Sequence, residues 1–260
     1  VLATLDLCGI EKIYKIGGAQ AIAALTWGTE SVENVDIIIG PGNKWVAEAK
    51  KQALSNINID MLAGPSEILI LADENNRADW VAADLLSQAE HDISAQAILV
   101  TDSENLLENV NKELVSQTKE LKRKDIVKKS IAENGYGILV SNINDAIEII
   151  NNIAPEHLSI LCKENSQIEN KITNAGVIFS DEWTPESMGD YIIGPSHILP
   201  TNGMAKRQSG LSVYNFLRRQ STISSSKKTI TTLGPSAMLL ADCEGLDAHA
   251  NSIKIRIKDS

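Results

Sequence analysis

The sequence contains only four histidines, and each has a carboxylate or amide side chain close by in the chain. They are His91, His157, His197 and His249. Imidazole titrates near neutral pH and also binds zinc, so a histidine beside an acid can move protons or hold a metal ion. The segments around these four residues are therefore the candidate sites.

The first segment, SQAEHD over residues 87–92, comes at the end of a predicted helix. At about 100° per residue, Asp84, Gln88 and His91 fall at i, i+4 and i+7 and share one helix face. Gln88 and His91 could then reach one zinc ion through an amide oxygen and an imidazole nitrogen. A histidine at a helix C-terminus is more often a partner of the helix dipole, so the pattern alone leaves both interpretations open.

The second segment contains the adjacent pair Glu156 and His157. Pro155 ends the preceding predicted helix, so the pair occupies a helix-to-strand turn, where α/β folds can expose polar groups to a cleft. Neighbouring side chains point in different directions, which lets His157 act near neutral pH and Glu156 act as a base toward water. A solvated Glu156 and a His157 that caps the strand explain the pattern equally well.

Two further segments surround isolated acids with turn residues. Glycines and prolines over residues 183–197 favour a rigid loop that holds Asp190 as a carboxylate metal ligand, although ordinary turn chemistry also accounts for them. Residues 244–249, EGLDAH, lie near the C-terminus, and a surface turn is their simplest interpretation.

The signals for a nucleotide are modest. Residues 17–20 (GGAQ) follow a predicted strand over residues 14–16 and open an Ala-rich helix, and residues 40–43 (GPGN) also lie between a strand and a helix. Both turns place backbone N–H groups where an anion could bind. Neither is a G-x-G-x-x-G fingerprint, and tight turns alone would explain these glycines.

Short β-branched runs alternate with helical patterns along most of the chain, which indicates α/β layering around a mainly parallel sheet. We expect strands over residues 36–39, 68–71, 97–100, 137–140 and 158–161, and helices over residues 44–54, 77–90, 105–121 and 145–153.

Proline- and glycine-rich turns at residues 64–66 and 194–210 predict two boundaries. We therefore expect three parts, over residues 1–66, 67–210 and a C-terminal arm over 211–260, and the family resemblance described below implies that the first contacts NAD and that the second is the zinc-binding catalytic domain.

The predicted arm has a pattern of its own. A Ser/Thr-rich stretch over residues 221–232 leads to a predicted turn at Gly234 and Pro235, an apolar helical stretch through Leu240 and a closing strand over residues 252–257. We expect a small appended domain.

The composition excludes several classes of protein. The chain has 260 residues, of which 43% are hydrophobic, and it can bury a sizeable core. A net charge of −10 disfavours a nucleic-acid partner, and no apolar run approaches the ~20 residues that span a membrane. The three cysteines are far apart and form no C-x-x-C pair, which favours a reducing, cytoplasmic setting.

Eight short motifs follow one another along essentially the whole chain. They are GGAQAIAAL (17–25), GPGN (40–43), LAGPSE (62–67), SQAEHD (87–92), APEHL (154–158), GDY (189–191), GPSHILPT (194–201) and EGLDAH (244–249). Together and in this order they resemble the histidinol dehydrogenase family. The resemblance implies an α/β fold with incomplete Rossmann-like, mainly parallel sheets in two domains, plus a small C-terminal arm.

The resemblance also implies a set of site residues. The zinc ligands are expected to be Gln88, His91, Asp190 and His249. These four are expected to contact the substrate together with Ser66, His157, His197 and Glu244. Gln20 and Asn43 match the family's NAD contacts.

The implied reaction is the oxidation of L-histidinol to L-histidine by NAD in two hydride transfers, through an aldehyde held on the enzyme. Zinc is expected to bind the substrate's imidazole and amino nitrogens. His157 is expected to remove the alcohol proton, and to act as base again in the second oxidation. Glu156 is expected to activate water for attack on the aldehyde.

Family enzymes are homodimers in which the C-terminal arm reaches the neighbouring active site, so His249 and Glu244 are expected to serve the partner's zinc. A monomer is then expected to bind zinc weakly and to turn over negligibly. The family also carries a further N-terminal portion, which would precede Val1, complete the first domain and supply an aromatic contact to NAD.

Three other functions fit parts of the pattern. The first is a related dehydrogenase for another small amino- or sulfo-alcohol, with the same zinc and NAD chemistry. The second is a zinc hydrolase in which Glu156 activates metal-bound water. The third is a truncated fragment that only dimerises.

Overall fold

A five-stranded, wholly parallel sheet positions most of the candidate residues. Its strand order is β5-β4-β3-β6-β7, so the chain starts in the centre, builds outward to one edge and returns to build the other. The strands are β3 (Glu67–Ala72), β4 (Gln96–Thr101), β5 (Gly135–Leu139), β6 (His157–Ile160) and β7 (Val177–Ser180).

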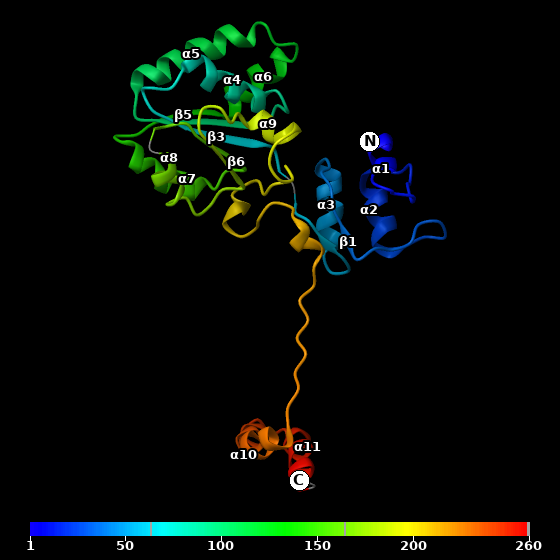
Figure 1. The fold of residues 1–260 in the computed structure, drawn as a ribbon. Helices are drawn as coiled ribbons and strands as arrows, with labels where there is room; N and C mark the ends of the chain where they lie inside the picture. Colours follow the sequence, from blue (N-terminus) through cyan, green and yellow to red (C-terminus); the bar gives the residue numbers. More distant parts are fainter. Residues whose placement is uncertain (63, 164, 259–260) are drawn as a thin grey trace. The chain divides into compact units, whose positions relative to one another are not determined.

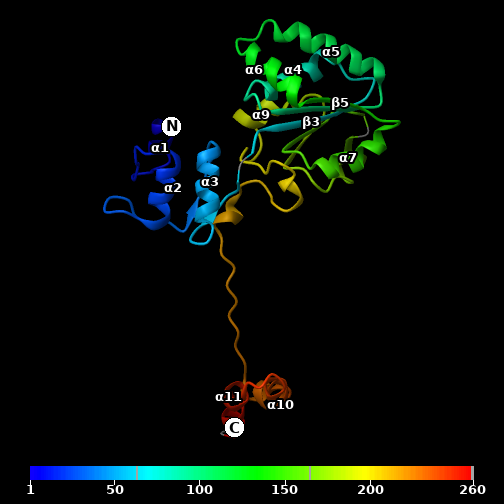
Figure 2. The same ribbon diagram turned by 180° about the vertical axis from the view of Figure 1, so that it is seen from behind.

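Helices cover both faces of this sheet. Helices α4 (Ala78–Ala89), α5 (Glu104–Thr118) and α6 (Lys124–Asn134) lie on one face, and α7 (Ala146–Ile153) and α8 (Asn165–Glu169) lie on the other (Figure 1 and Figure 2). Ile68 and Ile70 of β3 pack toward α4 and α5, whereas Leu69 and Leu71 pack toward α7. Since both faces are buried, β3 is apolar at nearly every position instead of alternating.

The computed structural model describes residues 1–62, 64–163 and 165–258, and these fall into two compact units, Val1–Phe216 and Leu217–Ser260. Ala63 of the LAGPSE motif and the last two residues of the predicted arm lie outside the described residues. The predicted domain limits at residues 66 and 210 stay predictions. Among the described helices, none has the length and apolar character needed to cross a bilayer.

The N-terminal part of the first unit carries a second, two-stranded parallel sheet. A small core forms around it from Ile22, Ile38, Ala53 and Ile57. Its elements are α1 (Leu2–Leu7), α2 (Gly18–Trp27), β1 (Ile37–Ile38), α3 (Lys44–Ala53) and β2 (Asn58–Ile59). The rest of the unit contains α9 (Glu186–Tyr191) and the 3₁₀ turns η1 (Ile143–Asp145), η2 (Met204–Lys206) and η3 (Val213–Phe216).

The second unit is a pair of helices, α10 (Lys227–Cys243) and α11 (Asp247–Lys258). The predicted turn at Gly234 and Pro235 is wrong, because both residues lie inside α10. The predicted strand over residues 252–257 is also wrong. Ile253 and Ile257 are four residues apart and share a helix face, and they pack so closely on Gly234 that a Cβ there would lie 2.8 Å from each side chain.

The α/β prediction is confirmed, and the five strands expected over residues 36–39 to 158–161 match β1, β3, β4, β5 and β6 with end shifts of one or two residues. The strand expected over residues 14–16 is wrong, because that segment has no regular structure and pairs with no described strand. The helices and strands absent from the sequence prediction, apart from the 3₁₀ turns, are α1, α6, α8, α9, β2 and β7. The lysine-rich sequence of α6 is typical of an exposed basic surface and did not predict a packed helix, although Val127 and Ser130 are buried.

Candidate functional site

The candidate site lies at the amino ends of β3 and β6. Glu67 begins β3 and His157 begins β6, where it pairs with Ile68 in register. In a parallel sheet each connecting helix runs back alongside the strands, so the last turn of α4 returns to the amino ends of the strands. Gln88 lies in that turn and His91 just beyond it. The segment meets the acids of α9, because Ser87 Oγ lies 3.4 Å from Glu186 Oε2.

A second cavity lies at the other end of the strands. A polar cavity of about 650 Å³ lies at the carboxyl ends of the strands, with Asp73, Ser103 and Lys163 among its lining residues. Open α/β sheets commonly bind ligands at that edge. None of the residues predicted for catalysis or metal binding lines it.

His157 is held as a neutral imidazole. Its Nδ1 atom lies 2.8 Å from the backbone oxygen of Glu67, and because a carbonyl only accepts, Nδ1 carries the proton. The lone pair is then on Nε2, which lies 3.8 Å from Oε1 of Glu186. Burial lowers the pKa of His157 below its ordinary value, which favours the neutral ring at pH 7.

Glu156 is buried beside it, with its Oε2 accepting a hydrogen bond from the backbone N–H of Glu67 at 2.9 Å. Burial raises the pKa of Glu156 to about 8, the Glu67 backbone hydrogen bond opposes this rise, and the neighbouring acids Glu67, Glu186 and Asp190 add to it. A carboxyl group with such a pKa can act as a proton acceptor at mildly alkaline pH.

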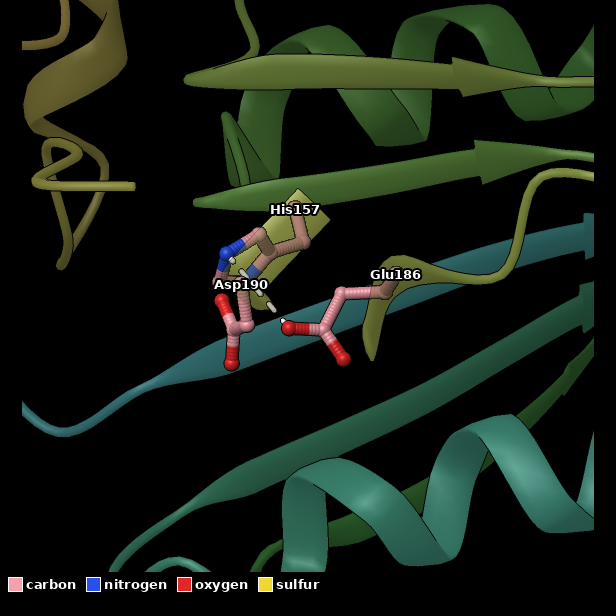
Figure 3. Close-up of side chains that lie close together, drawn as sticks. All are labelled: His157, Glu186 and Asp190. Atoms are coloured by element: carbon pink, nitrogen blue, oxygen red, sulfur yellow. Dashed lines mark ion pairs between the residues drawn. The ribbon is translucent and has the colours of Figure 1, made fainter. Parts of the chain in front are cut away.

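Glu186 and Asp190 lie one turn apart on α9 and point toward His157 (Figure 3). One donor atom from each of the three residues lies within 4.8 Å of the other two. Glu186 is 1% exposed, and burial, followed by the charge of Asp190, raises its pKa to about 7. Asp190 Oδ2 is 3.9 Å from Nε2 of His91, so two predicted zinc ligands are close together.

Four buried polar atoms of the described site residues have no hydrogen-bond partner. They are Oε1 and Nε2 of Gln88, Nε2 of His157 and Oε1 of Glu186. Each buried polar group left unpaired costs about 1–3 kcal/mol, so native proteins rarely tolerate several in one place without a ligand. Oxygen and imidazole nitrogen donors suit zinc, and the residues present therefore fit that ion.

A cavity of about 170 Å³ opens beside His157. Asp190, Ser196 and His197 contribute polar groups to its wall, while Phe179 and other apolar side chains form the remainder. The structure thus brings the predicted pocket residues His157, Asp190 and His197 to one cavity.

The other predicted residues lie elsewhere. Ser66 directly precedes β3, and its backbone oxygen accepts a hydrogen bond from Gln96 N at 2.9 Å. Asn43 caps α3 by accepting from the backbone N–H groups of Trp45 and Val46, and Gln20 is exposed in the first turns of α2. Their contacts with NAD or substrate stay predictions.

Glu244 and His249 belong to the second unit, where both side chains are exposed. Glu244 follows α10 and His249 lies in the first turn of α11. That Glu244 and His249 serve the zinc site of a partner chain stays a prediction.

The sequence prediction missed Glu67 and Glu186. Glu186 had a usable signal, since it stands four residues before Asp190 and would share a helix face with it. Pro185 and Gly189 hid that helix by suggesting a loop. Glu67 had no local signal, because its partner Glu156 is 89 positions away in the chain.

Comparison with known proteins gives one consistent family. The family model for histidinol dehydrogenase matches residues 1–257. The histidinol dehydrogenase of Lactococcus lactis subsp. lactis is 48% identical over 259 residues, covering 100% of this chain and 60% of that protein. The one from Wolinella succinogenes is 50% identical over 257 residues, with coverages of 99% and 60%.

A solved structure agrees with these relatives. The crystal structure of histidinol dehydrogenase from Elizabethkingia anophelis matches with a TM-score of 0.94 at 42% identity, over 99% of this chain and 60% of that one. The chain therefore spans about 60% of the length of the relatives it matches. The resemblance inferred from the eight motifs is confirmed, and the chain belongs to the histidinol dehydrogenase family.

Proposed function

We propose that this chain forms the catalytic part of a zinc- and NAD-dependent enzyme that oxidises L-histidinol to L-histidine in histidine biosynthesis. The observation that carries the proposal is the buried pair Glu156 and His157, of which His157 lines a small cavity, together with buried polar atoms of the site that have no hydrogen-bond partner among the described residues. Family membership supports the choice of substrate.

The residues proposed to hold zinc are Gln88, His91 and Asp190, with His249 supplied by the second chain of a homodimer. When bound, zinc would supply a charge that fixes the imidazole and amino nitrogens of the substrate in the cavity. Glu186 is buried directly beside Asp190, and its carboxylate would add to the negative charge around the ion.

NAD would accept hydride from the carbinol carbon, and Gln20 and Asn43 are proposed to contact it. Asn43 already uses its side-chain oxygen to cap α3, so its amide group is the part available to a nucleotide. Neither residue needs to touch the reacting atoms in this proposal.

His157 is proposed to accept the alcohol proton in the first oxidation. Its Nε2 carries the lone pair because Nδ1–H donates to Glu67 O, so Nε2 is the nitrogen that would accept the proton. The proton makes the ring cationic, and Glu186 at 3.8 Å stabilises that charge.

Glu156 is proposed to take a proton from water as the water attacks the aldehyde and gives a hydrate. His157 releases its first proton to solvent and then accepts a hydroxyl proton of that hydrate as the second hydride leaves, which yields the carboxylic acid of histidine. The two oxidations release two hydrides, so two molecules of NAD are consumed for each histidinol.

The wider expectations from the sequence remain proposals. The enzyme is proposed to be a cytoplasmic homodimer whose active site takes Glu244 and His249 from the neighbouring chain, and to lack nucleic-acid and membrane partners. The net charge of −10 supports the absence of a nucleic-acid partner.

A coupled assay on the full-length gene product tests the function. The protein is mixed with Zn²⁺, NAD and L-histidinol, and NADH is followed by its absorbance. NADH formation supports the proposal, and its absence from intact zinc-loaded protein contradicts it. NADH from another small alcohol alone would favour a related dehydrogenase.

A further inference from the structure

Glu67 connects three parts of the candidate site through its backbone and its side chain. It is the first residue of β3 and is 7% exposed. Its backbone N–H donates to Glu156 Oε2 at 2.9 Å, and its backbone oxygen accepts from His157 Nδ1 at 2.8 Å. Its carboxylate accepts from the backbone N–H groups of Glu156 at 3.3 Å and of Asn202 at 2.7 Å.

The contacts with Glu156 form a reciprocal clamp. Each glutamate uses its carboxylate to accept a hydrogen bond from the backbone N–H of the other. The clamp lies one position before the pairing of Ile68 with His157, so it extends the strand pairing at the amino ends of β3 and β6. Removing either carboxylate would leave a buried backbone N–H without its acceptor.

The contact with His157 fixes a tautomer. The orientation of the Glu67 carbonyl decides whether Nδ1 keeps its proton, and the carboxylate anchors that residue at two points. The side chain of Glu67 therefore anchors the residue whose carbonyl meets Nδ1 of His157.

The contact with Asn202 ties in the segment that carries His197. Residues 194–197 line the cavity beside His157, and Thr201, which is buried just before Asn202, accepts a hydrogen bond from Gly64 N at 2.7 Å. The Glu67 carboxylate and the Thr201 hydroxyl thus join the start of β3 to the end of the His197 segment.

We propose that Glu67 is a positioning residue whose carboxylate holds Glu156, His157 and the His197 segment in the arrangement needed for proton transfer. This inference rests on the proposed function of Glu156 and His157. Two backbone N–H donors converge on the two carboxylate oxygens, and a carboxylate offers two acceptors where an amide offers one acceptor and one donor. Glutamine at position 67 would keep the size of the side chain, but its NH₂ group would face one of these two backbone N–H groups, and two donors cannot form a hydrogen bond with each other.

The test compares Glu67→Gln and Glu67→Ala with the control Asn76→Ala in the zinc-loaded full-length gene product. Asn76 links the same two strands at the opposite edge of the sheet, through its amide to the backbone oxygen of Leu161 at 2.9 Å. The control therefore loses a comparable contact far from the candidate site.

We expect Glu67→Gln to lower kcat by about 10- to 100-fold, because a displacement near 1 Å can cost about 100-fold, with KM changed by less than about threefold. Glu67→Ala should lower kcat further, and Asn76→Ala should keep the wild-type kcat and bound zinc. Equal losses in Glu67→Gln and Asn76→Ala, or an unchanged kcat in Glu67→Gln, would overturn the proposal.

Nitrogen NMR of the His157 ring supplies a readout that does not depend on turnover. The wild type should show the Nδ1–H tautomer, and Glu67→Gln should show a mixture, with the His157 signals assigned by comparison with His157→Asn. A wild type that makes no NADH would refute the proposed function, whereas an unchanged tautomer in Glu67→Gln would refute the positioning role alone.

Discussion

The Nδ1 atom of His157 lies 2.8 Å from the backbone oxygen of Glu67, and this contact leaves Nε2 as the basic nitrogen of the ring. Nε2 is the atom that faces Glu186 and Asp190 on α9 (Figure 3). The proton-accepting direction of His157 is therefore set by the pairing of β3 with β6. The role of each ring nitrogen can therefore be tested separately by substitution.

Replacing His157 by asparagine separates the two nitrogens. The asparagine amide can still donate to Glu67 O from the position of Nδ1, but nothing replaces Nε2. We expect kcat to fall by about 100- to 10,000-fold, the usual contribution of a general base, while bound zinc and the thermal midpoint stay near wild type. A kcat within about tenfold of wild type would show that His157 is not the base.

Replacing Glu156 by glutamine should affect the second oxidation more than the first. The amide oxygen can still accept from Glu67 N–H, but the group can no longer take a proton from water. NADH formed per histidinol should drop from two toward one, with aldehyde accumulating on the enzyme or in solution. Two NADH per histidinol at the wild-type rate would contradict this role.

The pH dependence of aldehyde oxidation should follow the ionisation of Glu156. Burial raises the pKa of Glu156 to about 8, and only the ionised form accepts a proton. The rate with the aldehyde as substrate should therefore rise as pH increases toward that value and level off above it. A rate that falls over the same range would contradict the assignment.

Glu186 should make the metal-free protein less stable at alkaline pH. Burial raises its pKa from 4.5 to about 7. The folded state is therefore fully stable with respect to this group below pH 4.5, where the carboxyl group is protonated in the folded and the unfolded chain, and it loses stability as the pH rises through about 7. Glu186→Gln should raise the free energy of unfolding by on the order of 2 kcal/mol at pH ~8 and have little effect at pH ~4.

Thermal unfolding of metal-free protein at the two pH values measures this effect. Glu182→Gln is the matched control, because Glu182 stands on the same segment and is exposed. Equal changes for Glu186→Gln at both pH values would exclude a buried charge as the cause.

Gln88 should affect stability and metal binding in opposite directions. Both polar atoms of its side chain are buried without partners among the described residues, so Gln88→Leu should raise the thermal midpoint of the metal-free protein. The same change should weaken zinc binding by about tenfold or more, because losing even a group that only orients a metal ligand costs about 10- to 100-fold. Calorimetric titration with Zn²⁺ and a melting curve decide the matter, and a lower midpoint with unchanged affinity would contradict the assignment.

The sequence predicted the parts of the site that have a local pattern. Pro155 before an apolar run placed Glu156 and His157 at the turn before a strand, and His157 is the first residue of that strand. The spacing of Gln88 and His91 placed both at the end of a helix, where Gln88 lies in the last turn of α4 and His91 just beyond it. The buried strands of the central sheet were equally visible, because continuous apolar runs mark strands covered on both faces.

Contacts between distant segments could not be predicted in this way. Glu67 reaches Asn202 across 135 positions, and no periodicity encodes such a contact. Helix α11 shows the other limit, since the spacing of Ile253, Ile255 and Ile257 fits a strand, and only packing against Gly234 favours the helix. Tertiary packing therefore decided the elements that the local pattern left ambiguous.

The yield of NADH per L-histidinol, measured to completion with the zinc-loaded full-length gene product, tests the central claim most directly. A base at His157 and a water-activating group at Glu156 together predict two NADH and one L-histidine for each histidinol consumed. A final yield of one NADH with the aldehyde as the end product, or no NADH at all, would contradict the account.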